Sequence, residues 1–141
     1  MASVMDFPAR GKVIGTKGDN IIFNPSNTNY ELYLDGASSA PLNVPVRAMI
    51  RAAARRLWTV PSGGNFIAPI FGPPRTVQGR VQLVDGNQLV VHAGTSIVVT
   101  LPSEDVALDL SSGPIGVGTL VNFVALPGAT IELLAPAAVK H

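Results

Sequence analysis

Glycine and proline residues divide this 141-residue chain into short apolar segments, and this division limits the folds that it can adopt. The chain has 14 glycines and 12 prolines. The runs between them are rich in Val, Ile, Leu and Phe, at the spacing typical of β-sandwiches and small barrels. Nine strands are predicted: 12–16, 21–24, 29–34, 65–71, 76–84, 88–92, 96–101, 120–126 and 130–134. The expected fold is all-β, either a small closed or partly open barrel of the OB type or a sandwich.

Residues 45–58 depart from this strand pattern. Pro45 suits an early helical position, and the alanines that follow are strong helix formers. Arg47, Arg51 and Arg55 are spaced by four residues and would form a basic stripe on a helix, with Arg56 beside it. The sequence therefore predicts one short α-helix over about 45–58.

Two strand units have related sequences. The first unit contains Gly11-Lys12-Val13, followed after four residues by Gly18. The second unit has the same pattern 68 positions later, with Gly79-Arg80-Val81 followed after four residues by Gly86. A one-residue gap then aligns the third strand of each unit. We interpret the chain as a single domain, 1–141, in which units 11–34 and 79–101 arise either from internal duplication or from the likeness that any two three-stranded meanders share.

Charge is scarce and unevenly distributed. Charged residues make up 13% of the chain and hydrophobic residues 47%, with a net charge of +1. Such a low charge favours association, so we expect a homo-oligomer. Residues 1–80 carry nine basic and four acidic side chains, whereas residues 81–141 carry one basic and five acidic. This asymmetry is typical of a nucleic-acid surface, or of complementary faces that meet within one chain or between copies.

The inventory of reactive side chains argues against catalysis. The chain has no cysteine, which excludes a thiolate nucleophile, a disulfide and a cysteine-type zinc site. Only His92 and His141 are available as histidine bases, and no Gly-x-Ser-x-Gly motif accompanies them. We expect no catalytic residues, no cofactor and no metal. With neither a signal peptide pattern nor an apolar run of about 20 residues, we expect a cytoplasmic protein that does not enter a membrane.

These features predict a non-catalytic interaction or assembly module that binds a copy of itself or another protein. Arg47, Arg51, Arg55 and Arg56 are the candidates for polar contacts, and Phe66 and Phe71, in the proline-rich connection 61–74, for apolar contacts.

The alternative is a single-stranded nucleic-acid-binding protein in which the arginines bind phosphates and aromatic rings stack on bases. An aromatic content of 6% and an isoelectric point near 8.2 favour it less.

Overall fold

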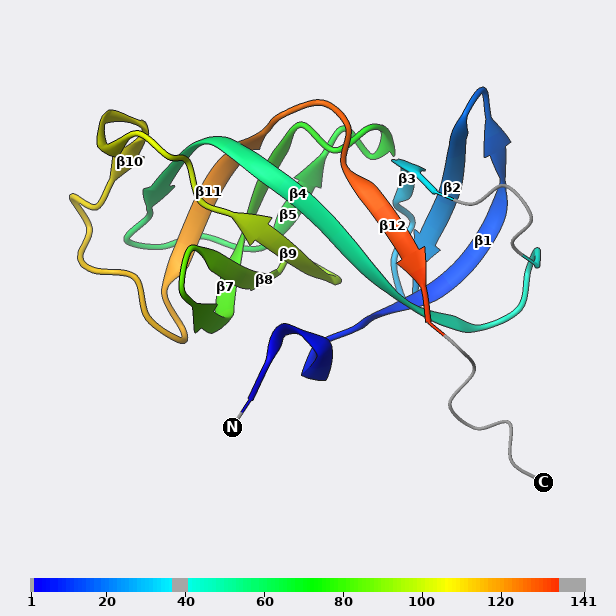
Figure 1. Cartoon of the computed structure of the whole chain (residues 1–141), viewed down its shortest axis with the longest axis horizontal. Helices are drawn as coiled ribbons and strands as arrows, with labels where there is room; N and C mark the ends of the chain where they lie inside the picture. The colour runs from blue at the N-terminus through cyan, green and yellow to red at the C-terminus, as the bar shows by residue number, and fades with distance from the viewer. Residues whose placement is uncertain (1, 37–40, 135–141) are drawn as a thin grey trace.

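The computed structural model describes residues 2–36 and 41–134 and confirms the all-β prediction. Twelve strands form one mixed sheet, and the described ranges contain no α-helix, only the 3-10 turns η1 (Val4–Asp6) and η2 (Asp105–Ala107) (Figure 1). The strands are β1 (Ala9–Lys17), β2 (Asn20–Pro25), β3 (Glu31–Asp35), β4 (Val46–Thr59), β5 (Phe66–Ala68), β6 (Phe71–Gly72), β7 (Thr76–Asp85), β8 (Gln88–His92), β9 (Ser96–Thr100), β10 (Leu108–Asp109), β11 (Leu120–Ala125) and β12 (Thr130–Leu133).

Every predicted strand overlaps a strand of the structure. The turns of the β1–β2 and β7–β8 hairpins contain Gly18 and Gly86, both with φ of 60°, a conformation that glycine adopts readily. The segment predicted as one strand over 65–71 is instead two short strands, β5 and β6. Pro69 follows the end of β5 and has no N–H to donate to a continuing ladder.

The predicted helix over about 45–58 is wrong, because this segment forms β4, the longest strand. Different parts of β4 pair with five other strands: β1, β9, β10, β11 and β12. Ala48, Ala52 and Ala54 are buried in the core. Hydrogen bonding to five neighbouring strands overrides the local helix propensity of alanine.

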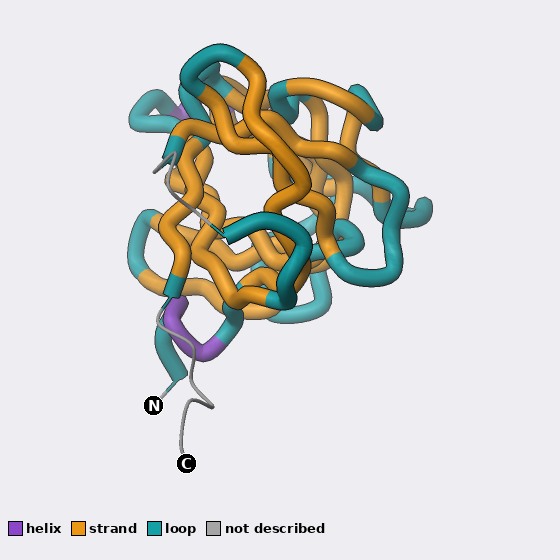
Figure 2. The backbone as a smooth tube through the Cα atoms, turned by 90° about the vertical axis from the view of Figure 1, so that its right-hand side faces the viewer, coloured by secondary structure: helices purple, strands orange, loops and turns teal. Residues whose placement is uncertain are grey.

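Strand pairing returns twice to β4. The sheet follows the path β1-β2-β3-β12-β4-β11-β7-β8-β9, and additional β1–β4 and β4–β9 pairings bring both ends of the path back to β4. We call β1, β2, β3, β12 and β4 the first circuit, and β7, β8, β9, β4 and β11 the second circuit. Figure 2 views the molecule from the side of the first circuit, whose strands curve into a partial ring.

The two hairpins repeat each other's pairing pattern. The β1–β2 ladder has a register shift after Val13, and the β7–β8 ladder has one after Val81, 68 residues later. In the third strands, Leu34 of β3 pairs with Ile21, and Val99 of β9 pairs with Leu89. These pairings align the third strands with a gap of three residues, instead of the one-residue gap expected from sequence, because the β8–β9 connection is shorter.

Most of the buried apolar side chains of residues 2–36 and 41–134 belong to two clusters. The main core extends through both circuits and includes Phe23 and Phe123, both fully buried. The smaller cluster, Met49, Val90 and Val98, is covered in part by Val4 and Phe7 of the N-terminal segment, by Leu83 and by Leu134. The N-terminal segment is thereby held against β4, β8 and β9. Within the described ranges, no helix is long and apolar enough to span a membrane.

Candidate functional site

The four arginines predicted as a binding stripe all lie on β4. A spacing of four residues keeps Arg47 and Arg51 on one face of a strand, as it would on a helix. In a strand, however, their Cα atoms are roughly 13 Å apart, whereas in a helix they would be about 6 Å apart. A register shift opposite β11 lies between Ala54 and Arg56, and Arg55 and Arg56 are both exposed. The arginines therefore form an extended series along β4 and not a compact stripe.

The acidic second half of the chain reaches β4 beside these exposed arginines. Arg55 and Glu104 line one shallow cavity of about 410 Å³. Arg56 and Asp109 line another, of about 330 Å³. The guanidinium carbon of Arg56 also lies 5.9 Å from the ring centroid of Trp58. Each of these two cavities is thus lined by one arginine and at least one acidic side chain of the same chain.

Residues 60–75, which we call the strap, carry both predicted apolar contact residues. Phe66 is 36% exposed and Phe71 is 58% exposed, and Ile70 between them is 47% exposed. Ile67, in contrast, is 2% exposed and belongs to the main core. The strap therefore anchors one large apolar side chain and leaves three others in contact with water.

Hydrogen bonds tether the strap at several points along its length. They are Val60 N to Leu120 O (2.9 Å), Gln78 Nε2 to Gly64 O (2.8 Å), Ile67 N to the Tyr30 hydroxyl (3.2 Å), Glu31 N to Ile70 O (2.8 Å) and Arg75 N to Ala68 O (2.9 Å). The last of these bonds lies within the strap, and the other four fix its backbone to Tyr30, β3, β7 and β11, so the exposure of the three apolar side chains is built into the fold.

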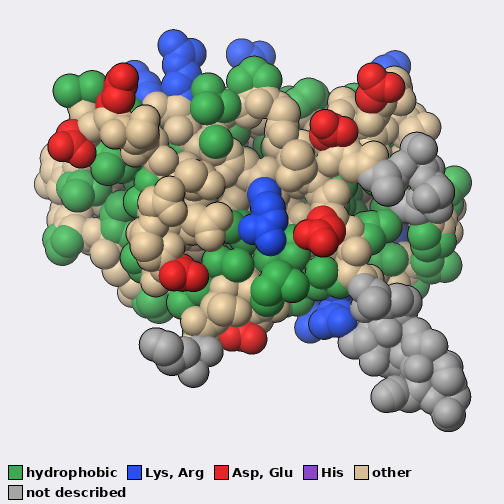
Figure 3. Space-filling view, in the orientation of Figure 1, with side chains coloured by type: hydrophobic (Ala, Val, Ile, Leu, Met, Phe, Trp, Pro, Cys, Tyr) green, Lys and Arg blue, Asp and Glu red, His purple; other side chains and the backbone are tan. Residues whose placement is uncertain are grey.

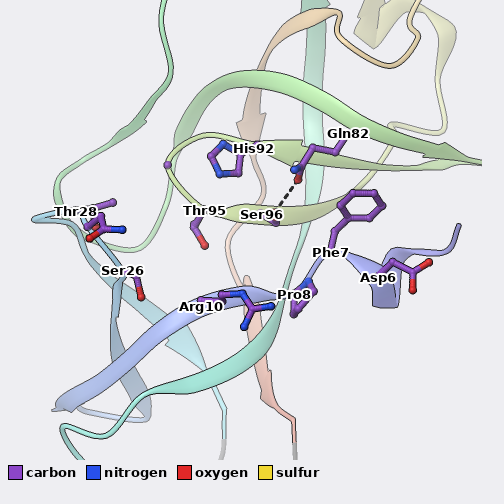
Figure 4. Close-up of a pocket in the computed structure, with 12 residues that line it drawn as sticks. Asp6, Phe7, Pro8, Arg10, Ser26, Thr28, Gln82, His92, Thr95 and Ser96 are labelled. Carbon is purple, nitrogen blue, oxygen red and sulfur yellow. Dashed lines mark hydrogen bonds between the residues drawn. The ribbon is translucent and has the colours of Figure 1, made fainter. Parts of the chain in front are cut away.

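A separate polar pocket of about 520 Å³ lies where the N-terminal segment meets the two circuits. It is lined by residues of four regions: 6–8 and 10, the β2–β3 connection 26–28, Gln82 of β7, and residues 92 and 94–96 around the β8–β9 turn (Figure 4). The β2–β3 connection and the β8–β9 turn occupy corresponding positions in the two repeated units.

Hydroxyl groups dominate the wall formed by the β8–β9 turn. Ser96 Oγ donates a hydrogen bond of 2.7 Å to Gln82 Oε1. Thr95 is 4% exposed, and its Oγ1 is buried without a hydrogen-bond partner. Figure 4 shows this hydroxyl pointing into the space between the turn and β1, where the Arg10 side chain also lies. The pocket thus combines a guanidinium with an unused buried hydroxyl.

None of the six residues predicted as a binding site lines this pocket. Of its lining residues, His92 is the one that the sequence analysis names, as an available histidine base. The signal that could have revealed the pocket is the presence of Ser26-Asn27-Thr28 and Gly94-Thr95-Ser96 in corresponding loops of the repeat. Polar loops at matching positions are expected to approach one another if the units pack about a shared strand.

The described ranges contain no group of three or more His, Asp or Glu side chains that could hold a metal ion. In comparisons with known proteins, no family model matches the chain, and no curated protein matches it either.

Proposed function

We propose that this chain is a non-catalytic assembly module that self-associates through the strap. The observation that carries the proposal is the exposure of Phe66, Ile70 and Phe71 on a backbone tethered by hydrogen bonds. Large apolar side chains gain about 1.5–3 kcal/mol when fully buried. A fixed loop that displays three of them within six residues suits a partner that covers them.

A second copy of the chain is the partner that the composition favours. The net charge of +1 and the charged fraction of 13% provide little repulsion between copies. Acidic and basic side chains are also interspersed on the face seen in Figure 3. Because Arg55 and Arg56 each share a cavity with an acidic side chain of the same chain, Glu104 and Asp109 respectively, we base association on apolar contacts.

We further propose that each circuit is an OB-like unit and that the two units arose by duplication. Each has a three-stranded meander, a strand antiparallel to its first strand and a strand parallel to its third. This order is that of a five-stranded Greek-key barrel. β4 serves as the fourth strand of the first circuit and as the fifth strand of the second, which accounts for its 14 residues.

Sedimentation velocity of the Phe66→Ser, Phe71→Ser double variant tests the proposed interface. In a two-fold dimer each substitution occurs twice. At about 1 kcal/mol per lost contact, association should weaken by roughly 4 kcal/mol, or several hundredfold. The matched control is Val106→Ser, because Val106 is 90% exposed but lies on η2, outside the strap. An unchanged mass for the double variant at every concentration would refute the strap interface.

Single-stranded nucleic acid is the second candidate ligand, and the pairing of Arg56 with Trp58 is the observation that favours it. Arginine and aromatic faces together can bind phosphates and stack on bases. Trp58 is the only tryptophan, so its fluorescence reports on this place alone. Quenching by oligo(dT) that weakens with salt would support this function, and unchanged fluorescence up to high micromolar oligonucleotide would exclude it.

A further inference from the structure

The polar pocket has the composition of a site for a small ligand. Its volume of about 520 Å³ falls within the range of pockets that hold small molecules. Phe7 and Pro8 form a less polar wall, and the packing of Phe7 against the Met49 cluster holds that wall in place. The remaining walls carry hydroxyl, amide, imidazole and guanidinium groups.

Thr95 and Gln82 of the pocket have hydrogen-bonding capacity that the protein does not use. Thr95 Oγ1 is buried and has no partner, although buried polar groups in proteins almost always have one. Gln82 uses its carbonyl oxygen to accept from Ser96, which leaves its NH2 group available as a donor. Thr28 Oγ1, by comparison, already donates to Pro25 O and accepts from Tyr30 N. The buried unpartnered hydroxyl and the free Gln82 NH2 group lie on the side of β7 and the β8–β9 turn.

The pocket lining carries one cationic side chain, Arg10, and one carboxylate, Asp6. Arg10 projects into the space below Ser96 in Figure 4, whereas the carboxylate of Asp6 points away from it. Asp6 Oδ2 accepts a 2.8 Å hydrogen bond from Ser3 N inside the η1 turn, so this carboxylate is already engaged. A guanidinium binds carboxylate and phosphate oxygens through paired N–H donors. The pocket thus presents a guanidinium to a ligand, while the one carboxylate of its lining is directed away from the space beside Arg10.

We propose that the polar pocket binds a small polyhydroxylated acid. Its anionic group pairs with Arg10, and its hydroxyls bond to Thr95 Oγ1 and the Gln82 amide. Sugar carboxylates and sugar phosphates share this chemistry. The site is distinct from the strap and does not depend on self-association.

Two-dimensional ¹H–¹⁵N NMR titrations of the full chain test the proposal with four probes: D-gluconate, glucose 6-phosphate, inorganic phosphate and neutral sorbitol. Gluconate or glucose 6-phosphate should shift the amide signals of Gly94, Thr95 and Ser96, and whichever binds more tightly identifies the anionic group. Absence of shifts with both acids up to about 10 mM, a range that covers Kd values in the millimolar region, would overturn the proposal. So would equal binding of sorbitol, or binding of inorganic phosphate as tight as that of glucose 6-phosphate.

Two variants separate ligand binding from folding. Arg10→Gln should weaken binding of the acid about tenfold or more, since a hydrogen bond to a charged group is lost, whereas the matched control Arg55→Gln should leave the affinity unchanged. Thr95→Val should weaken binding roughly fivefold without lowering thermal stability, because it replaces an unpartnered hydroxyl with a methyl group. Unchanged affinity in both Arg10→Gln and Thr95→Val would refute the assignment.

Discussion

Two glycines at matching positions of the repeated hairpins permit a close approach between strands that no side chain would allow. A Cβ atom built on Gly79 would lie 2.8 Å from the carbonyl carbon of His92 and closer still to its oxygen. One built on Gly11 would lie 2.9 Å from Cα of Pro25 and closer still to the oxygen of Asn24. Optimal contact between carbon atoms begins at about 3.5 Å, so the partner strand would have to move by more than half an ångström.

Alanine at either glycine should therefore destabilise the fold. Backbone, unlike the end of a flexible side chain, cannot rotate away, so we expect a cost near the upper end of the range for overpacking, about 3 kcal/mol for Gly11→Ala and for Gly79→Ala alike. For a domain of this size the melting temperature should fall by about 10 °C.

Thermal denaturation followed by circular dichroism measures this effect. Gly15→Ala is the matched control in β1, because its nearest neighbour, Ile22 Cδ1, would lie 3.9 Å from the new methyl group. It should stay within about 1 kcal/mol of the parent protein. If Gly11→Ala and Gly79→Ala are as stable as Gly15→Ala, the close strand approach and the correspondence between the hairpins are both wrong.

Three further expectations follow from the same structure. Tyr30→Phe removes the acceptor for the Ile67 N–H and should lower the free energy of unfolding by about 1 kcal/mol in urea titrations. The control Tyr33→Phe should leave the free energy of unfolding unchanged, and equal effects of the two substitutions would contradict the hydrogen bond between Tyr30 and the strap. The sequence alone predicts that Arg51→Glu with Arg55→Glu disturbs partner binding. An interface at the strap instead predicts that this arginine variant keeps the solution mass and circular dichroism spectrum of the parent protein. Dissociation of the arginine variant would show that the interface includes β4. Truncation of the strap anchor in Ile67→Ala should cost about 2–5 kcal/mol in the same titrations, and a smaller loss would mean that the strap is not held by the core.

The strands were predictable because their signals are local. Short apolar runs end at glycines such as Gly18 and Gly86, whose conformation the hairpin turns require. The correspondence between the hairpins was also visible in sequence, because it depends on identical spacing of glycine and valine. The length of the gap before the third strand could not be predicted from sequence, since it is set by how β3 pairs with β2 and β9 pairs with β8.

β4 could not be predicted from its own residues. Its alanines and arginines favour a helix locally, and a spacing of four fits a period of 3.6 as well as a period of two. What makes the segment a strand is pairing with neighbours from residue 9 to residue 133, information that the segment does not contain. The partial burial of Arg47 and Arg51 follows from that pairing.

The strap and the polar pocket also differ in how far sequence alone could reveal them. Phe66 and Phe71 could be selected from sequence because a proline-rich connection often displays its side chains. The polar pocket combines residues from 6 to 96 and takes shape only when the N-terminal segment packs beside the β8–β9 turn. Thr95 lies in one of the two corresponding polar loops of the repeat, whereas Arg10 lies in no motif that would have identified it.

The solution mass, measured by light scattering at about 50 mM and about 500 mM salt, tests the proposed assembly most directly, because the screening length falls from above 10 Å to a few ångström over that range. Association through the strap predicts a mass that is the same multiple of 14.7 kDa at both salt concentrations. A monomer at both concentrations, or an oligomer that dissociates at high salt, would contradict it.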